Sequence, residues 1–159
     1  MQLTLHTDYA LRVLIYLRLK GDSLVTISEI ADFYQISRNH LVKVVHHLAG
    51  HGFIHTTRGK HGGMRLARSA DLISVGEVVR KMEPNFTVVE CFSVASRPCA
   101  VMPLCALKGL LYQGMNDFLA TLDRFTLADA VIAQQSGTEN SAAGGFPVKV
   151  RVERPAPGD

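Results

Sequence analysis

All three cysteines of the chain lie in one short segment, at Cys91, Cys99 and Cys105. Their spacing is C-x7-C-x5-C, and Pro98 and Pro103 stand between them. Thiolates are soft ligands that bind zinc, copper(I) or the irons of an iron–sulfur cluster. Because an odd number of cysteines cannot form a complete set of internal disulfides, the segment is a candidate for chemistry that uses free thiols.

The spacing alone leaves three interpretations of these cysteines open. They could hold a metal or an iron–sulfur cluster, act as a redox thiol sensor, or pack as small apolar side chains. Structural zinc sites usually contain closely spaced cysteine pairs, which are missing here. A cluster would need a fourth ligand besides the three thiolates. No catalytic base or cofactor loop accompanies the cysteines, so an enzyme with a cysteine nucleophile is not expected.

A second group of residues indicates binding to a polyanion. Residues 33–70 contain no Asp or Glu, but they carry six of the seven His of the chain. A surface of this kind suits nucleic acid, although a solvated basic face is the alternative that composition leaves open. The Lys and Arg residues of this stretch are Arg38, Lys43, Arg58, Lys60, Arg65 and Arg68.

The elements around this stretch follow the order helix, turn, helix and hairpin. Apolar residues at helical spacing predict helices over 7–20, 28–34 and 38–49. Two extended segments, 53–57 and 64–67, flank a basic tip that is rich in glycine, which predicts a β-hairpin. This order predicts a mainly α fold with a small β-hairpin, namely a winged helix-turn-helix.

The predicted fold assigns roles to the polar side chains. The second helix of a helix-turn-helix meets base edges near its N-terminus, where Arg suits guanine and Asn suits adenine. A flexible basic wing contacts phosphates or a minor groove. His46, His47 and His51 are expected to be exposed polar residues rather than zinc ligands. The expected DNA-binding residues are Ser37, Arg38, Asn39, His40, Lys43, Arg58, Lys60 and Arg65.

The remaining elements are predicted from helix caps and apolar spacing. Thr7 is expected to cap the first helix, and Ser74 with Glu77 predicts a capping box that opens a helix to about Met82. From Leu104 a heptad-like stripe predicts a long helix that pairs two copies across a twofold axis. A cap at Thr126 predicts a short last helix. The stripe consists of Leu104, Leu107, Leu111, Met115, Phe118, Leu122 and Phe125.

Five segments together resemble the iron–sulfur winged-helix regulators of the IscR and NsrR type. They are MQLTLHTDYALRVLIYL, ISRNHLVKVVHHL, TRGKHGGMRLAR, VGEVVRKMEP and LDRFTLADAV, and the resemblance covers residues 1–135. It implies a homodimeric transcriptional repressor that binds a partly palindromic, double-stranded operator and carries one cluster per subunit, either 4Fe–4S or 2Fe–2S. In NsrR-type members nitric oxide attacks the cluster and releases the DNA.

The resemblance also implies a set of cluster ligands. Cys91, Cys99 and Cys105 fall where the family has its cluster loop. The IscR branch places a His ligand three residues after its last Cys, but here that position is Lys108. NsrR-like members can use the Asp of an N-terminal Thr-Asp-Tyr element across the dimer, which is Asp8 here. The alternatives are that Asp8 only stabilises its helix and that Glu90 or solvent is the fourth ligand.

The resulting organisation has four parts. Residues 1–83 form the winged helix-turn-helix domain, 84–103 the cluster-binding loop with its third Cys at 105, 104–135 the dimerisation helix and short last helix, and 136–159 a disordered tail. No apolar run is long enough to cross a bilayer, so a cytoplasmic protein without membrane contact is expected. The alternative function is a regulator that responds to thiol redox state, zinc or iron–sulfur status rather than to nitric oxide specifically.

Overall fold

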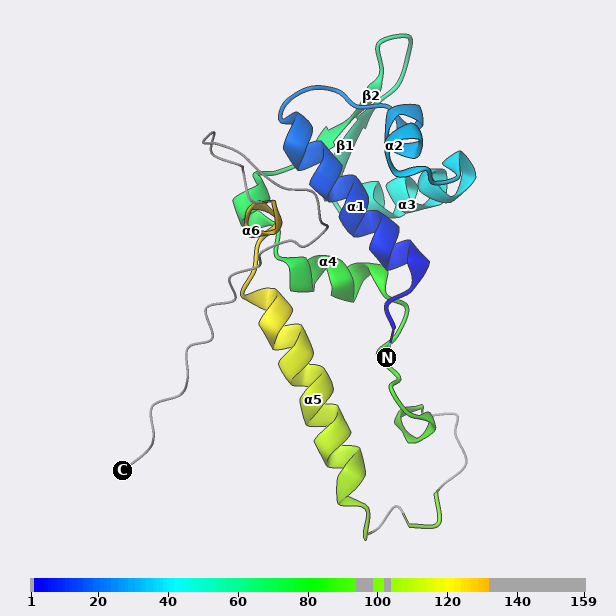
Figure 1. Cartoon of the computed structure of the whole chain (residues 1–159), viewed down its shortest axis with the longest axis vertical. Coiled ribbons are helices and arrows are strands. Elements are labelled where there is room, and N and C mark those ends of the chain that lie inside the picture. Colours follow the sequence, from blue (N-terminus) through cyan, green and yellow to red (C-terminus); the bar gives the residue numbers. More distant parts are fainter. Residues whose placement is uncertain (1, 94–98, 102–103, 132–159) are drawn as a thin grey trace, which may run out of the picture.

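The computed structural model describes residues 2–93, 99–101 and 104–131. Three helices, α1 (Leu5–Lys20), α2 (Ile27–Tyr34) and α3 (Arg38–Gly50), precede a hairpin of β1 (Ile54–Thr57) and β2 (Gly63–Leu66). A 3-10 turn, η1 (Ala70–Leu72), leads into α4 (Val75–Met82). The hairpin projects from one end of this unit, and the long helix α5 (Ala106–Asp123) extends from the other (Figure 1).

The core lies where α1, α2, α3 and the hairpin meet. The apolar stripe predicted for the third helix is buried, because Leu41, Val44, Val45 and Leu48 all face this core. Burying such side chains is the main source of stability, at about 1.5–3 kcal/mol each. Other large side chains with almost no exposure in this cluster include Leu14, Leu17, Ile30, Phe53, Ile73 and Leu127.

The hairpin is antiparallel, and Ile54 pairs with Leu66 and Thr57 with Gly63. An isolated bridge joins the hairpin to the segment between α1 and α2, because Val25 and Met64 exchange backbone hydrogen bonds of 3.0 and 2.8 Å. At the tip, Gly59 has a φ of 114°, which favours glycine. The wing is therefore anchored at its base and ends in a tight turn.

The first helix begins earlier than predicted. It starts at Leu5, and its N-cap residue is Thr4 rather than Thr7. The Thr4 hydroxyl accepts a hydrogen bond of 3.3 Å from the backbone N–H of Thr7. Thr7 is buried, and its hydroxyl donates to Glu83. The Glu83 carboxylate also accepts hydrogen bonds from the backbone N–H and the hydroxyl of Thr4. The prediction of Thr7 as cap was wrong because Glu83, distant in sequence, takes its hydroxyl.

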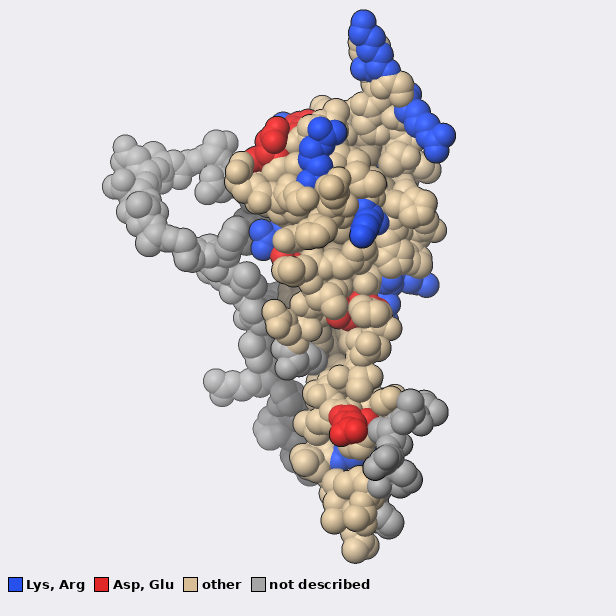
Figure 2. Space-filling view, turned by 90° about the vertical axis from the view of Figure 1, so that its right-hand side faces the viewer, with Lys and Arg blue, Asp and Glu red and all other residues tan. Residues whose placement is uncertain are grey.

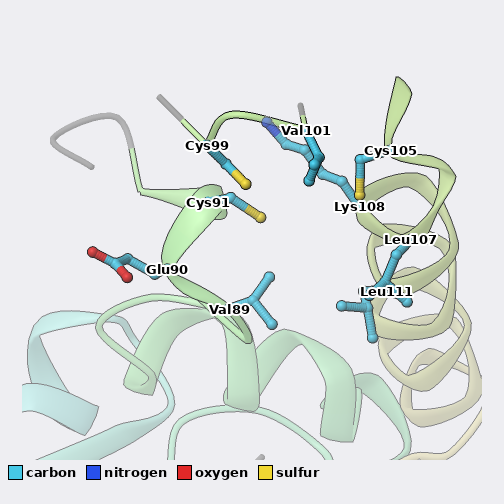
Figure 3. A pocket seen from close by; sticks show the side chains of 9 residues that line it. All are labelled: Val89, Glu90, Cys91, Cys99, Val101, Cys105, Leu107, Lys108 and Leu111. Atoms are coloured by element: carbon cyan, nitrogen blue, oxygen red, sulfur yellow. The ribbon is translucent and has the colours of Figure 1, made fainter. Parts of the chain in front are cut away.

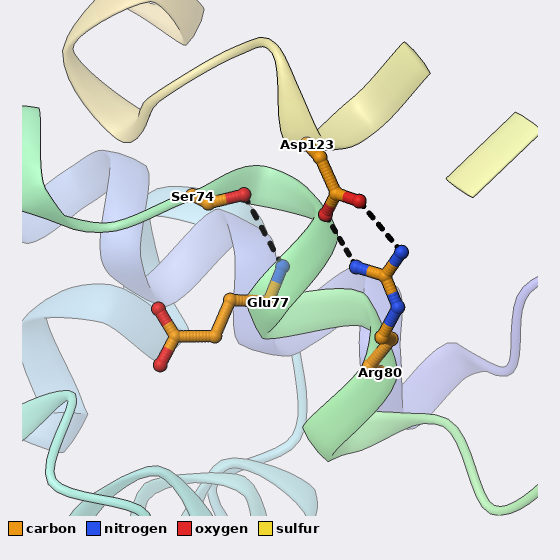
Figure 4. Close-up of polar contacts among 4 residues, drawn as sticks. All are labelled: Ser74, Glu77, Arg80 and Asp123. Carbon is orange, nitrogen blue, oxygen red and sulfur yellow. Dashed lines mark hydrogen bonds and ion pairs between the residues drawn. The ribbon is translucent and has the colours of Figure 1, made fainter. Parts of the chain in front are cut away.

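The capping box predicted at the start of α4 is only half formed. The Ser74 hydroxyl accepts a hydrogen bond of 3.4 Å from the backbone N–H of Glu77 (Figure 4). The Glu77 carboxylate instead accepts a hydrogen bond of 2.6 Å from Arg68. A complete capping box is present at Thr126 and Asp129, where it opens α6 (Leu127–Ala130). The last four residues of the range 104–135, predicted to hold the long helix and the short last helix, and the predicted tail 136–159 lie outside the described residues.

The predicted long helix is present as α5, which begins at Ala106 with Cys105 as its N-cap residue. Its C-terminal part packs on α4 and buries Met115 and Leu119. Leu104 just before it and Leu107, Leu110 and Tyr112 on its N-terminal part are exposed, and Leu104 is 94% exposed. No helix among the described residues is both long and apolar enough to cross a membrane.

Candidate nucleic-acid interface and cysteine site

The turn between α2 and α3 determines how the recognition helix is presented. Gln35 takes the left-handed conformation with a φ of 54°, and its side-chain amide donates to the Asp32 carbonyl at 2.6 Å. The backbone N–H of Ile36 donates to the Ala31 carbonyl at 3.0 Å, which closes the end of α2. This tight connection lies between the two helices predicted over 28–34 and 38–49, and residues 37–40 at the start of α3 are exposed.

All five residues predicted to bind DNA from α3 are exposed. Ser37 is the N-cap residue, but its side chain accepts no hydrogen bond from the helix. Its hydroxyl and the N-terminal N–H groups of α3 are thus available to a phosphate, which helix N-termini favour. The His40 ring lies 6.4 Å from the Tyr9 ring, so α1 supports this side chain.

Among the described residues, the cations predicted to bind DNA are free of ion pairs, whereas Arg12, Lys20, Arg68 and Arg80 are paired with carboxylates. In the part of the chain that the structure describes, four side-chain ion pairs are present, and none includes the predicted DNA-binding residues. The protruding hairpin tip carries basic side chains and no acidic one (Figure 2). Such unpaired charges can release counterions when phosphates replace them. The predicted DNA-binding cations that form no ion pair in the described residues are Arg38, Lys43, Arg58, Lys60 and Arg65.

Arg68 differs from the other cations of the acid-free stretch. It forms an ion pair with Glu77 at 2.6 Å, and its guanidinium lies 5.5 Å from the centre of the Phe53 ring. Arg68 therefore joins the base of the wing to α4, and its role is structural.

Lys60 offers a test of the wing. Replacing Lys60 with Ala is expected to weaken binding to all DNA sequences by a similar factor, because a lysine at the tip contacts phosphate rather than bases. The slope of log K against log salt concentration should become shallower by about 1. Titrations by fluorescence anisotropy at several salt concentrations measure both. A change in sequence preference without a change in slope would contradict a phosphate contact.

The histidines of α3 are less exposed than predicted in one case. His47 is half-buried, and its two ring nitrogens lie 3.0 Å from His6 Nε2 and from His51 Nε2. Burial lowers the pKa of His6 and of His51, and the neighbouring His47 lowers both further. The neutral rings are therefore favoured. His46 and His51 are exposed, as expected.

The three cysteines line one cavity of about 540 Å³ between the η2 turn (Glu90–Phe92) and the start of α5. Cys91 and Cys99 lie side by side on one wall, and Cys105 projects from the opposite wall (Figure 3). All three are free thiols. The remaining lining side chains are mostly apolar, although Cys99 and Val101 are exposed, so the cavity is partly open to solvent. These remaining lining residues are Val89, Val101, Leu107 and Leu111, together with Glu90 and Lys108.

The other candidate ligands lie differently. Asp8 is not among the cavity residues; it forms an ion pair of 2.9 Å with Arg12 on α1. The Glu90 carboxylate points away from the cysteines (Figure 3). Within the described ranges, no group of three His, Cys, Asp or Glu is close enough together to hold a single metal ion. In the described part of the chain, three thiols thus surround one space, and the carboxylate of Glu90, which also lines it, is turned away from them.

Two residues of the site were not predicted as functional from the sequence. Lys108 supplies a positive charge at the cavity wall, which would offset the negative charge of thiolates. Lys108 follows Cys105 by three residues, a spacing that places two residues on the same side at the start of a helix. This spacing could have been used to predict that Lys108 lies near the cysteine. Glu83, which ties the start of the cysteine loop to α1, carried no local signal because its partners are 76 and 79 residues away.

An exposed basic helix-turn-helix with a wing, followed by a cysteine-lined cavity and a long exposed helix, defines a DNA-binding transcriptional regulator. The sequence matches the Rrf2 family, described as iron-dependent transcriptional regulators, over residues 3–133. Because the match spans most of the chain, the protein belongs to the Rrf2 family. This class consists of regulators, in agreement with the expectation that the chain is not an enzyme.

Two characterised relatives confirm the resemblance seen in the motifs. The HTH-type transcriptional regulator NsrR of Bacillus licheniformis is 45% identical over 135 residues, which cover 84% of this chain and 94% of that protein. NsrR of Bacillus subtilis strain 168 is 46% identical over 132 residues, which cover 82% of this chain and 90% of that protein. The chain is therefore similar to NsrR proteins over nearly their whole length.

Solved structures confirm the fold. A transcriptional regulator from Listeria innocua has a TM-score of 0.68 at 24% identity and covers 92% of this chain and 96% of its own. Staphylococcus aureus CymR in its oxidised form has a TM-score of 0.64 at 28% identity, and the match covers 80% of this chain and 93% of the CymR chain. IscR of T. potens has a TM-score of 0.65 at 23% identity, covering 87% and 94%.

Proposed function

We propose that this regulator is a homodimeric repressor that carries an iron–sulfur cluster and releases its operator when nitric oxide reacts with that cluster. The observation that carries the proposal is the gathering of all three thiols of the chain around one largely apolar cavity. The identity of 45% to an NsrR protein supports the same assignment. One cluster per subunit, 4Fe–4S or 2Fe–2S, would occupy this cavity.

The residues present fit such a group. Three soft thiolates are the ligands that cluster irons prefer, and Lys108 offsets part of their charge. When bound, the cluster supplies irons that react with nitric oxide. The cysteines would hold this group between the η2 turn and α5, and its binding would tie these two segments together.

On the DNA side, the roles follow from exposure and charge. Arg38 and Asn39, which are exposed at the start of α3, are proposed to contact bases in the major groove, and Ser37 to contact a phosphate. Lys43, Arg58, Lys60 and Arg65 extend this surface with free cations, and His40 adds a polar contact. Two such surfaces, one per subunit, would lie about 34 Å apart, one turn of the duplex.

Asp8 is proposed as the fourth ligand, donated to the cluster of the other subunit. In this chain its carboxylate is paired with Arg12 and half exposed, so it is accessible to a partner. A carboxylate is a hard, weak ligand for iron, which makes this bond the labile one.

Replacing Asp8 with Ala is expected to change the visible spectrum of the cluster and the rate of its reaction with nitric oxide, while leaving the helical content near that of the wild type. Stopped-flow absorbance under anaerobic conditions measures the rate, and Asp22→Ala is a matched control in the same domain. An unchanged spectrum and rate would return Asp8 to a role in helix stability, worth about 0.3–1 kcal/mol.

A second candidate function is a thiol-based redox regulator that is not specific to nitric oxide. The observation that favours it is the exposure of the free Cys99 thiol, because accessible thiols are open to oxidation. Purification without oxygen separates the two proposals. A coloured protein with iron and acid-labile sulfide supports the cluster. A colourless protein whose thiols form a disulfide on mild oxidation supports the redox regulator.

A further inference from the structure

The joint between α4 and α5 connects the DNA-binding unit to the helix that ends at the cysteine site. Two backbone hydrogen bonds form a pivot there: Val75 N–H donates to the Phe125 carbonyl at 2.9 Å, and Leu127 N–H to the Ile73 carbonyl at 2.8 Å. An isolated bridge between Ser74 and Thr126 lies at the same place. These bonds fix the position of the end of α5, and its direction then depends on its side-chain contacts with α4, including the packing of its C-terminal part with Met115 and Leu119 buried.

A polar contact on α4 adds a directional restraint to this packing. Arg80 donates two parallel hydrogen bonds to the carboxylate of Asp123, the last residue of α5 (Figure 4). Paired Arg–carboxylate contacts of this kind define orientation as well as distance. The hydrogen bonds from Arg80 hold the pKa of Asp123 below its ordinary value, so the carboxylate is ionised at neutral pH.

Gly76 is shaped to this contact. A methyl group at Gly76 would overlap the Asp123 carboxylate and would also crowd its backbone nitrogen. The first turn of α4 therefore has room for Asp123 only because this residue has no side chain.

The position of Asp123 is not explained by helix stability. A negative charge at a helix C-terminus faces the negative end of the helix dipole, which is unfavourable. Both side chains of the pair are 41% exposed, so the ion pair adds little to the free energy of unfolding. What remains is the geometric role of the pair.

That geometry has leverage because α5 is long and rigid. Its 18 residues span about 27 Å, with the joint at one end and Cys105 at the other. A rotation of about 10° at the joint moves the far end by about 5 Å, more than the rise of roughly 3.4 Å per base pair of DNA. We infer that the Arg80–Asp123 pair, seated over Gly76, sets the angle between the dimerisation helix and the recognition helix, and thereby the half-site spacing that the dimer accepts. This inference rests on the proposed homodimer.

The test compares Asp123→Asn with Asp117→Asn in the cluster-loaded dimer. Asp117 is an exposed carboxylate on the same helix and forms no ion pair in the part of the chain that the structure describes, so it controls for the lost charge. Gly76→Ala is a second variant, since it displaces the carboxylate without removing any charge. Visible absorbance and circular dichroism should be the same in all four proteins.

Double electron–electron resonance measures the separation of the two recognition helices. Each subunit carries one spin label, attached to an unnatural amino acid that replaces the exposed Val42. The wild type and Asp117→Asn should give the same narrow distance distribution, and Asp123→Asn and Gly76→Ala a shifted or broader one. In parallel, the wild type is used to select an operator from random duplexes. Variants of this operator are then made in which the spacing between the half-sites differs by one base pair. The preference of Asp123→Asn for the selected spacing should fall by about 5-fold or more.

The outcomes separate this inference from the proposed function. Distances and spacing preference of Asp123→Asn that match those of Asp117→Asn would overturn the role of the pair, although the dimer and its operator would stand. A wild type that gives no distance between subunits would contradict the homodimer itself, and the inference with it.

Discussion

Replacing any one of Cys91, Cys99 and Cys105 with Ala is expected to remove the iron–sulfur cluster and, with it, high-affinity operator binding. The chain has three cysteines in all and no spare thiol to take the place of a missing one. Each variant, purified without oxygen, should retain less than about a tenth of the wild-type iron and sulfide. Operator affinity should fall about 5- to 100-fold, the usual range for coupling between two sites.

The matched control is Glu90→Gln, because Glu90 is next to Cys91 in sequence but its carboxylate points away from the cysteines (Figure 3). It should keep the cluster and the operator affinity of the wild type. A cysteine variant that still held stoichiometric iron would contradict its role as ligand. Loss of iron in Glu90→Gln would instead make Glu90 the missing fourth ligand and displace Asp8 from that role.

Replacing Arg38 with Ala is expected to weaken binding to the operator by about 1–3 kcal/mol and to relax the base preference at one position of each half-site. Arg38 is exposed at the start of α3 and has no ion pair that would hold it away from DNA, among the residues that the structure describes. Competition titrations against operators with single base changes measure both effects.

The control for this prediction is Arg18→Ala, because Arg18 is also exposed and unpaired in the described structure but lies near the end of α1. It removes the same charge and should change affinity by much less. Equal affinity and equal base preference in Arg38→Ala and the wild type would show that the start of α3 does not read the DNA.

The parts of the fold that depend on local patterns could be predicted from the sequence. The apolar residues of α3 recur at helical spacing, and the same residues, Leu41, Val44, Val45 and Leu48, are buried in the core. Glycines such as Gly59 mark the tip of the wing. The complete capping box at Thr126 and Asp129 is also a local signal.

The errors have long-range causes. Thr7 and Glu77 both had suitable local sequence for capping, but Glu83 takes the Thr7 hydroxyl and Arg68 takes the Glu77 carboxylate. Competition of this kind between distant partners is invisible to any rule that compares residues three or four apart.

The candidate site shows the same division. The cysteines could be recognised because they are few and clustered, and the free cations because no acid lies near them in sequence. The pairing of Arg80 with Asp123 could not be predicted, since 43 residues separate them. Asp8 remains a prediction from resemblance, because its proposed partner is a second subunit.

The central claim is that the state of the cluster controls binding to DNA, and an anaerobic titration with nitric oxide tests it most directly. Cluster absorbance and operator binding, by fluorescence anisotropy, are followed in the same sample as nitric oxide is added. The account predicts that both signals fall together and that the protein stays folded and dimeric. Operator affinity that persists after the cluster absorbance has been lost would contradict it.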